Sequence, residues 1–211
     1  MARPRKQDEK DIPGLAIASA RCLLEKDGLS GVTMARIAAA VGCSAPALYG
    51  HFRNRDALLR AVHDAGFEQL VRDKVAVAAQ TAGDPIGRLR EGGRAYVAFA
   101  LDNPALYHLM FNPPPLPEFA GNPFEHDAGM ASLLLLRRAV EAAQAAGYLP
   151  AEDADRVAFI LWSTVHGAVS LMLQNRAPHP AADRQALGWQ VVDSAISLIT
   201  SSRASGPSRD A

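Results

Sequence analysis

The stretch that decides the fold runs from Val32 to Leu59 and reads VTMARIAAAVGCSAPALYGHFRNRDALL. After Thr33, which is a good helix cap, apolar residues recur three and four positions apart, and this spacing predicts a short helix. Gly42 is expected to end that helix, because glycine adopts the left-handed backbone conformation that a sharp turn requires. The first half of the stretch is therefore predicted to be a capped helix followed by a tight turn.

The second half predicts another short helix, over residues 45–51, capped by Ser44. Pro46 falls in its first turn, where a missing N–H does little harm. Leu48 and Phe52 lie four residues apart and are expected to anchor this helix to the core. Two short helices joined by a tight turn are typical of a helix-turn-helix motif that reads DNA.

This stretch resembles the N-terminal DNA-binding domain of the Tet-repressor (TetR) family. The residues that carry the resemblance are Thr33, Ile37, Ala38, Gly42, Ser44, the LYGHF pentad of residues 48–52, Arg55, Asp56, Leu58 and Leu59. The resemblance implies a homodimer. Further along, Trp162, His166 and Gly167 are similar to the signature of the TetR subgroup whose C-terminal domain is named after a Trp-His-Gly motif.

Composition favours an all-α protein of about nine helices, because alanine and leucine are abundant and no strand-like alternation persists. The chain of 211 residues has two cysteines, Cys22 and Cys43. Without a secretory leader, they indicate a reduced, cytoplasmic setting. No apolar run is expected to reach membrane-spanning length, which predicts a soluble protein. Cys43 precedes the second short helix, as either a packing residue or a redox switch.

Charge is distributed unevenly although the formal net charge is zero. Residues 1–60 hold 10 basic and 6 acidic side chains, whereas the remainder holds 12 basic and 16 acidic ones. A basic first part and an acidic second part fit a DNA-binding head and a separate body. Arg3, Arg5 and Lys6 form either a phosphate or minor-groove arm or a solvated, disordered terminus.

Four regions are predicted along the chain. They are a basic disordered arm (1–10), a helix-turn-helix domain (11–55), an effector-binding and dimerisation domain (56–201) and a disordered tail (202–211). Outside the motif, helices are expected at 11–26, 56–80, 86–102, 104–111, 124–144, 151–175 and 182–201, and the proline-rich segment 112–123 is expected to be a surface loop that borders a pocket.

Contacts to DNA are expected from both helices of the motif and the residues after them. Ala45, Pro46 and Ala47 would face the bases, where small apolar groups can meet thymine methyls but cannot form side-chain hydrogen bonds. Specificity would then depend on Ser44, Tyr49 and DNA shape. The remaining expected contacts, mainly to phosphates, are Thr33, Arg36, His51, Arg53 and Arg55. Thr33 and Ser44 also fit a capping role, and the arginines also fit solvated surface charge.

An apolar effector pocket is expected in the body. The candidate lining residues are Tyr96, Phe99, Met110, Phe111, Met130, Leu134 and Trp162, each of which also fits an ordinary core position. His166 is expected to be a hydrogen-bonded interface histidine rather than a metal ligand. The six histidines show no metal-ligand spacing, and no cofactor site is expected.

The last two long helices are apolar on two faces each, and a single subunit covers only one face easily. This pattern predicts a four-helix interface between two subunits. The expected interface residues are Phe159, His166, Val169 and Leu173 from the first helix and Val191, Ala195 and Leu198 from the second.

These observations predict a ligand-responsive DNA-binding transcription regulator, a repressor that binds a near-palindromic operator as a homodimer and is released by a small apolar effector. No nucleophile–base set or phosphate loop predicts an enzyme. The alternatives are a small-molecule carrier or sensor with weak or no sequence-specific DNA binding, and an activator or nucleoid-type binder with little sequence preference.

Overall fold

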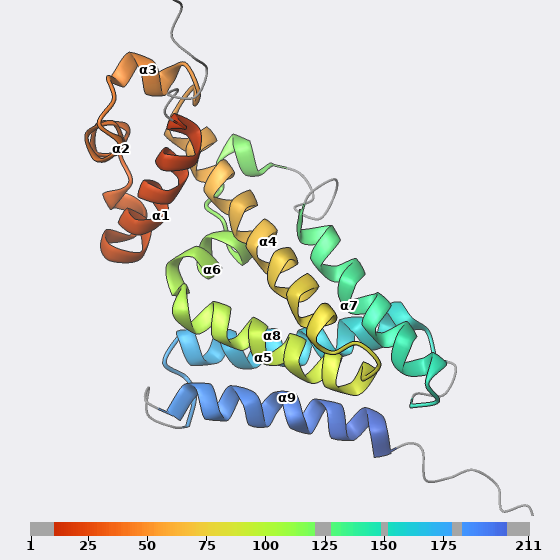
Figure 1. Cartoon of the computed structure of the whole chain (residues 1–211). Helices are drawn as coiled ribbons and strands as arrows, with labels where there is room; N and C mark the ends of the chain where they lie inside the picture. Colours follow the sequence, from red (N-terminus) through yellow and green to blue (C-terminus); the bar gives the residue numbers. More distant parts are fainter. Residues whose placement is uncertain (1–10, 121–127, 149–151, 179–182, 202–211) are drawn as a thin grey trace, which may run out of the picture. The chain divides into compact units, whose positions relative to one another are not determined.

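The structure is a computed structural model that describes residues 11–120, 128–148, 152–178 and 183–201. Within these ranges every regular element is helical, which confirms the all-α expectation. The elements are α1 (Ile12–Gly31), α2 (Met34–Val41), α3 (Ala45–Tyr49), α4 (Arg55–Gln80), α5 (Pro85–Asp102), α6 (Pro104–Phe111), the short 3₁₀ helix η1 (Pro117–Phe119), α7 (Ala128–Ala145), α8 (Ala154–Leu173) and α9 (Arg184–Ser201) (Figure 1).

Parts of several predictions lie outside the described residues. They are the basic arm (1–10), the tail (202–211), the end of the loop expected at 112–123, and the starts of the helices expected at 124–144, 151–175 and 182–201.

The chain divides into two compact units. Unit 1 comprises Met1–Gly66 and Ala105–Pro123, and unit 2 comprises Phe67–Pro104 and Phe124–Ala211. The expected boundary at residues 55 and 56 differs from this division. The first turns of α4 belong to unit 1, and α6 and η1 join the same unit although they are distant in sequence.

The helix-turn-helix in unit 1 forms as its caps predict. The Thr33 hydroxyl oxygen accepts a hydrogen bond from the Arg36 backbone N–H at 3.3 Å. Gly42 adopts the left-handed conformation with φ 67°, as the tight turn requires. The Ser44 hydroxyl accepts from the Ala47 N–H at 3.2 Å and begins α3. Regular helix in α1 stops at Gly28, whose φ is 67°, and one more turn follows.

Apolar side chains on one side of each helix make the core of unit 1. Ala16, Ala20 and Leu24 of α1, Ile37 of α2 and Leu48 of α3 are buried. They pack as the three- and four-residue spacing predicts, so the opposite side of α3 is left exposed.

Unit 2 is a helical bundle in which α5 packs against α7, α8 and α9, and α8 packs against α7 and α9. Two glycines let α5 and α9 approach closely. A Cβ on Gly93 would lie 2.9 Å from Val192, and one on Gly188 would lie 2.4 Å from Val97. Close packing against α9 therefore explains the glycine at position 93 of the Gly92–Gly93 pair in α5.

Helix α8 corrects one expectation from the sequence. Ala154–Leu173 is 20 residues long and apolar enough to cross a membrane by length and composition, the one such helix among the described residues. A core helix of a soluble bundle passes the same test, and α8 packs on two neighbours within unit 2. Its length and composition alone therefore do not place the helix in a membrane.

Candidate DNA interface and ligand cavity

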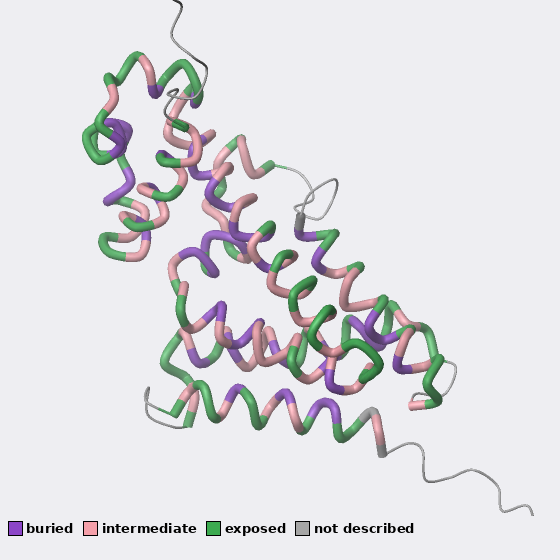
Figure 2. Tube along the Cα trace, in the orientation of Figure 1, coloured by how far each residue is buried: buried purple, intermediate pink, exposed green. Residues whose placement is uncertain are grey.

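Helix α3 presents an exposed polar and aromatic surface in unit 1. Ser44, Ala45 and Pro46 at its start are exposed, as are Tyr49 and His51 at its end (Figure 2). Tyr49 keeps 51% of its surface exposed although it is a large aromatic residue. In the described part of the chain, no side-chain hydrogen bond involves Tyr49 or His51, so both polar tips are available to a partner.

Two of the arginines expected to contact DNA are engaged within unit 1. Arg36 pairs with Asp27, and its other terminal nitrogen donates to the Gly31 carbonyl at 2.8 Å. The half-buried Arg55 donates through Nε to the Val32 carbonyl at 2.7 Å and through a terminal nitrogen to Leu29. These bonds satisfy backbone carbonyls at the end of α1, so both residues stabilise the head whether or not they also reach DNA.

Glu118 in η1 forms a small polar cluster at the start of α4. Its carboxylate accepts from Arg53 and from the Asn54 amide, each at 3.0 Å. The Asn54 hydrogen bond, assisted by a backbone bond and the Arg53 side chain, holds the pKa of Glu118 below its usual range. Asn54 also caps α4 by accepting from the Ala57 N–H at 2.7 Å. The described part of the proline-rich segment, residues 112–120, therefore belongs to unit 1 and is not among the residues that line the cavity described below, contrary to expectation.

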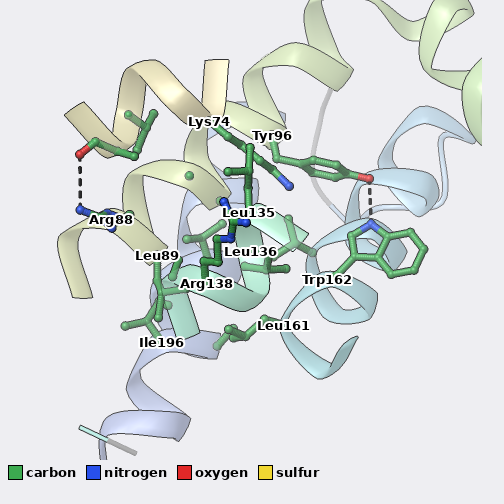
Figure 3. A pocket seen from close by; sticks show the side chains of 18 residues that line it. Lys74, Arg88, Leu89, Tyr96, Leu135, Leu136, Arg138, Leu161, Trp162 and Ile196 are labelled. Carbon is green, nitrogen blue, oxygen red and sulfur yellow. Dashed lines mark hydrogen bonds between the residues drawn. The ribbon is translucent and has the colours of Figure 1, made fainter. Parts of the chain in front are cut away.

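Unit 2 contains a cavity of about 180 Å³ between α4, α5, α7, α8 and α9 (Figure 3). Most of its lining is aliphatic. Of the seven expected pocket residues, Tyr96 and Trp162 line it. The other five do not: Met110 and Phe111 belong to unit 1, Phe99 is buried outside the cavity lining, and Met130 and Leu134 are exposed on α7. Leu135 and Leu136, the next two residues, line the cavity instead.

Tyr96 and Trp162, which line this cavity, form a polar cluster with His166. The Trp162 Nε1–H donates to the Tyr96 hydroxyl oxygen at 3.3 Å, and that hydroxyl lies 2.9 Å from Nδ1 of His166. Burial lowers the pKa of His166, which favours the neutral ring. Since an indole N–H can only donate, the Tyr96 hydroxyl accepts from it and can donate its own proton to His166. His166 is thus hydrogen-bonded, and its partner belongs to the same protomer.

Basic residues at the cavity were missed by the sequence interpretation. Lys74, Arg88 and Arg138 all line it. One signal for Lys74 was present: it continues the spacing of Phe67, Leu70 and Val77 on α4 and therefore falls on the apolar side of that helix. No comparable spacing signal identifies the two arginines.

An exposed apolar face runs along α8 and α9. On α8 it comprises Phe159, Ile160 and Leu171, and on α9 Leu198 is 75% exposed. A shallow hollow lined by Ile160, Leu187, Val191 and Leu198 lies along the two helices. An exposed apolar face of this kind on two adjacent helices marks a site of contact with another molecule.

This face corrects part of the expected interface. Val169 is fully buried within the protomer and cannot contact a partner, whereas Phe159 and Leu198 are exposed, and Val191 and Ala195 line the hollow. The exposed stripe on α8 therefore includes Phe159, which was expected at the interface, together with Ile160 and Leu171, which were not. Both faces of α8 are apolar, so the spacing alone could not determine which one faces inward.

The described residues contain no group of three or more His, Cys, Asp and Glu side chains that could hold a metal ion. Cys43 is half-buried and Cys22 is exposed, and neither forms a disulfide.

Comparison with known proteins places this geometry in one family. Residues 89–195 match the family model described as "Tetracyclin repressor-like, C-terminal domain", and residues 16–62 match "Bacterial regulatory proteins, tetR family". The chain is 43% identical over 53 residues to the tetracycline repressor protein class A from transposon 1721 of Escherichia coli. That match covers 25% of this chain and spans only about a quarter of the repressor (24%).

Two solved structures resemble nearly the whole fold. A protein of unknown function from Rhodococcus sp. RHA1 is 30% identical, with a TM-score of 0.78, over 96% of this chain and 100% of that one. A putative TetR-family transcriptional regulator from Mesorhizobium loti is 16% identical, with a TM-score of 0.71, over 89% of this chain and 96% of that one. The second likeness shows the fold alone. The match over residues 89–195 covers about half of the chain by itself, and the match over residues 16–62 covers the helix-turn-helix. The chain therefore belongs to the TetR family, which consists of transcription regulators and not of enzymes.

Proposed function

We propose that this protein is a homodimeric transcription repressor whose two α2–α3 motifs bind a near-palindromic operator, and that a small molecule in the cavity of unit 2 releases it. Members of the family bind DNA, act as dimers and respond to small-molecule effectors. They are soluble cytoplasmic proteins. The operator, the effector and the interface of this chain are our inferences.

One observation carries the DNA-binding proposal: the exposed end of α3, where Tyr49 and His51 project from a helix that Ser44 caps and Leu48 anchors. A fixed helix with an exposed phenol and imidazole is suited to a major groove, with both groups placed to bond phosphates. The first residues of α3 are small, so the backbone can lie close to thymine methyls. Sequence preference would then depend on DNA shape as well as on base contacts.

Arg53 is the best candidate among the arginines for a phosphate contact. Its side chain is 74% exposed, and its present partner is a single carboxylate, that of Glu118. Arg36 and Arg55 already donate to backbone carbonyls, so we assign them first to the head's stability. The guanidinium side of this pair is open to solvent, so a phosphate can compete with Glu118 for Arg53.

The exposed face of α8 and α9 supports dimerisation. Phe159, Ile160, Leu171 and Leu198 would leave a continuous apolar surface in solvent if the chain remained a monomer. Two copies related by a twofold axis would pair this face with itself, because such an interface uses the same patch on both partners. We also propose the finer assignment to the Trp-His-Gly subgroup, on Trp162, His166 and Gly167, the first two of which join the Tyr96 cluster at the cavity.

Release is proposed to be a population shift. An effector that binds one conformation of unit 2 more tightly stabilises the dimers with that conformation. If the heads of those dimers no longer match two grooves about 34 Å apart, operator affinity falls by the same coupling free energy.

An electrophoretic mobility shift with DNA from upstream of the protein's own gene tests this function. We expect a specific complex that weakens steeply with salt, and a loss of at least about tenfold in affinity for His51→Ala, as removal of a phosphate contact on both heads predicts. The matched control is His108→Ala, because His108 is also an exposed histidine of unit 1 but lies on α6. Equal affinities of the two variants would contradict the proposed interface.

A further inference from the structure

The cavity of unit 2 carries an excess of positive charge. Lys74, Arg88 and Arg138 line it, and no aspartate or glutamate does. Within the described residues, none of the three pairs with a carboxylate. In the same unit, Arg90 pairs with Asp193, and Arg137 pairs with Glu141. Three cations without a carboxylate partner therefore lie at an otherwise apolar cavity, where burying a charge is costly unless a ligand pairs with it.

Two hydrogen bonds hold the ammonium group of Lys74. Its ammonium nitrogen donates to the Ser132 hydroxyl at 2.8 Å and to the Ser132 carbonyl at 2.9 Å, and both partners are neutral. An ammonium group has three donors, so one is left after these bonds. Figure 3 shows the side chain extending from α4 towards Tyr96, into the cavity. Burial lowers the pKa of Lys74 to about 8, which still leaves the group charged at neutral pH.

Arg88 adds a second donor group. One terminal nitrogen donates to the Ala78 carbonyl at 3.4 Å, a long bond, and the buried Nε has no hydrogen-bond partner. A guanidinium group offers five N–H donors in a plane that matches a carboxylate. Arg138 is exposed on α7 and adds positive charge at the cavity's edge.

The rest of the cavity sets the size and polarity of the ligand. Its volume of about 180 Å³ slightly exceeds that of a cavity which holds one benzene molecule, roughly 150 Å³. Leucine, valine, isoleucine and alanine side chains make most of its walls. Gly92 has nothing within 4 Å of where its Cβ would stand, so the space beside α5 is open. The cavity thus fits an apolar body of about one ring or a short chain, with one anionic group.

We propose that the effector is a small monocarboxylic acid whose apolar body fills this cavity and whose carboxylate pairs with Lys74 and Arg88. The inference that this ligand is the effector rests on the proposed function, but its binding does not require DNA. Ser132 is neutral, so a carboxylate bound at Lys74 would supply the missing negative charge and offset the cost of burying the ammonium group.

Isothermal titration calorimetry of the full chain without DNA tests the ligand class. The probes are benzoate for a ring, hexanoate for a chain, and their neutral amides benzamide and hexanamide. We expect one of the acids to bind at least about tenfold more tightly than its own amide, because the charge-assisted bonds are lost in the amide. Comparing benzoate with hexanoate shows whether the cavity prefers a ring or an alkyl chain in its ligand. Equal affinity of each acid and its amide, or no binding of either acid at millimolar concentration, would overturn the proposal.

Three variants locate the site. Lys74→Met should reduce acid affinity at least about tenfold and leave amide affinity unchanged, whereas Lys26→Met, a lysine of unit 1 outside the cavity, should change neither. Gly92→Leu should abolish binding, because its side chain would occupy the open space. Circular dichroism checks that each variant is folded. Undiminished acid binding by folded Lys74→Met or Gly92→Leu would contradict the assigned site.

The two proposals can fail separately. If the acid binds but an operator complex is not weakened by it, the ligand class stands and the ligand-released repressor fails. If DNA binds specifically but no acid binds, the regulator stands and the ligand class fails.

Discussion

The ammonium nitrogen of Lys74 lies 2.8 Å from the hydroxyl oxygen of Ser132, and the two residues join α4 to α7 at the edge of the cavity. This bond holds a positive charge against a neutral partner in an apolar setting. Such an arrangement costs stability, because desolvation disfavours the charged form and no opposite charge offsets it. The cost is expected where a site is prepared for a ligand.

Replacing Lys74 by Met should therefore stabilise the free protein. We expect Lys74→Met to raise the free energy of unfolding at pH 7 by about 1 to 3 kcal/mol, since the variant no longer buries a charge and its side chain fills similar space. Urea denaturation followed by circular dichroism measures the change. A variant less stable than the natural chain would show that the Ser132 bonds outweigh the desolvation cost.

The pH dependence of this difference has a definite sign. The pKa of Lys74 is lowered from 10.5 to about 8 in the folded chain, so between these values the unfolded chain binds more protons. The stability of the natural chain should consequently rise relative to Lys74→Met as pH increases from about 8 to 10.5, and the gap should be widest below pH 8. Denaturation at pH 7 and pH 9.5 tests this, and a gap independent of pH would contradict it.

The neighbouring glycines of α5 should respond oppositely to alanine. Gly92→Ala places a methyl group in open space and gains helix propensity, so it should stabilise the protein by about 1 kcal/mol. Gly93→Ala places one against Val192 at 2.9 Å, a stiff β-branched side chain, and should be less stable than Gly92→Ala by about 1 to 3 kcal/mol. Thermal denaturation compares the pair. Equal stabilities would argue against the close approach of α5 and α9.

The proposed interface predicts that charge on the α8–α9 face prevents dimerisation. Leu198→Glu should raise the dimer Kd by at least about 100-fold without unfolding the chain, because an unpaired carboxylate would be buried only on association. Val75→Glu is the matched control, since Val75 is also an exposed aliphatic residue of unit 2 but lies on α4. Sedimentation equilibrium should find Leu198→Glu monomeric and Val75→Glu dimeric, and a dimeric Leu198→Glu would place the interface elsewhere.

Glu118 competes with DNA for Arg53 in the proposed account. Glu118→Gln removes the negative charge beside that guanidinium, so it should strengthen DNA binding and steepen its salt dependence by about one to two phosphate contacts per dimer. Fluorescence anisotropy over a series of salt concentrations measures both. An unchanged slope would show that Arg53 does not reach a phosphate.

The head of the molecule could be predicted almost completely from its sequence, because its signals are local. Thr33, Gly42 and Ser44 each act within three residues of their own position, and each does in the structure what its type predicts. The engagement of Arg36 and Arg55 could not be predicted in this way. Their partners are backbone carbonyls around the end of α1, and no side-chain pattern marks those.

The body was harder to predict because its helices are apolar on more than one side. The spacing of apolar residues in α8 indicated two apolar faces but not which of them points inward. It therefore predicted that Val169 lies at an interface, whereas Val169 is buried in the protomer. The cavity is formed by five helices, so its lining depends on tertiary packing. Among the basic residues of the cavity, only Lys74 could be recognised in the sequence, as a charged residue at an apolar position of α4.

Selection of bound duplexes from a random DNA pool tests the central claim most directly, because it requires both specific reading and twofold pairing. The account predicts an enriched inverted repeat whose half-sites are centred about 10 base pairs apart, or a multiple of one helical turn, and no such enrichment with Leu198→Glu. Two outcomes would contradict the account. Either no sequence is enriched, or a single unrepeated site is enriched equally by the natural chain and by Leu198→Glu.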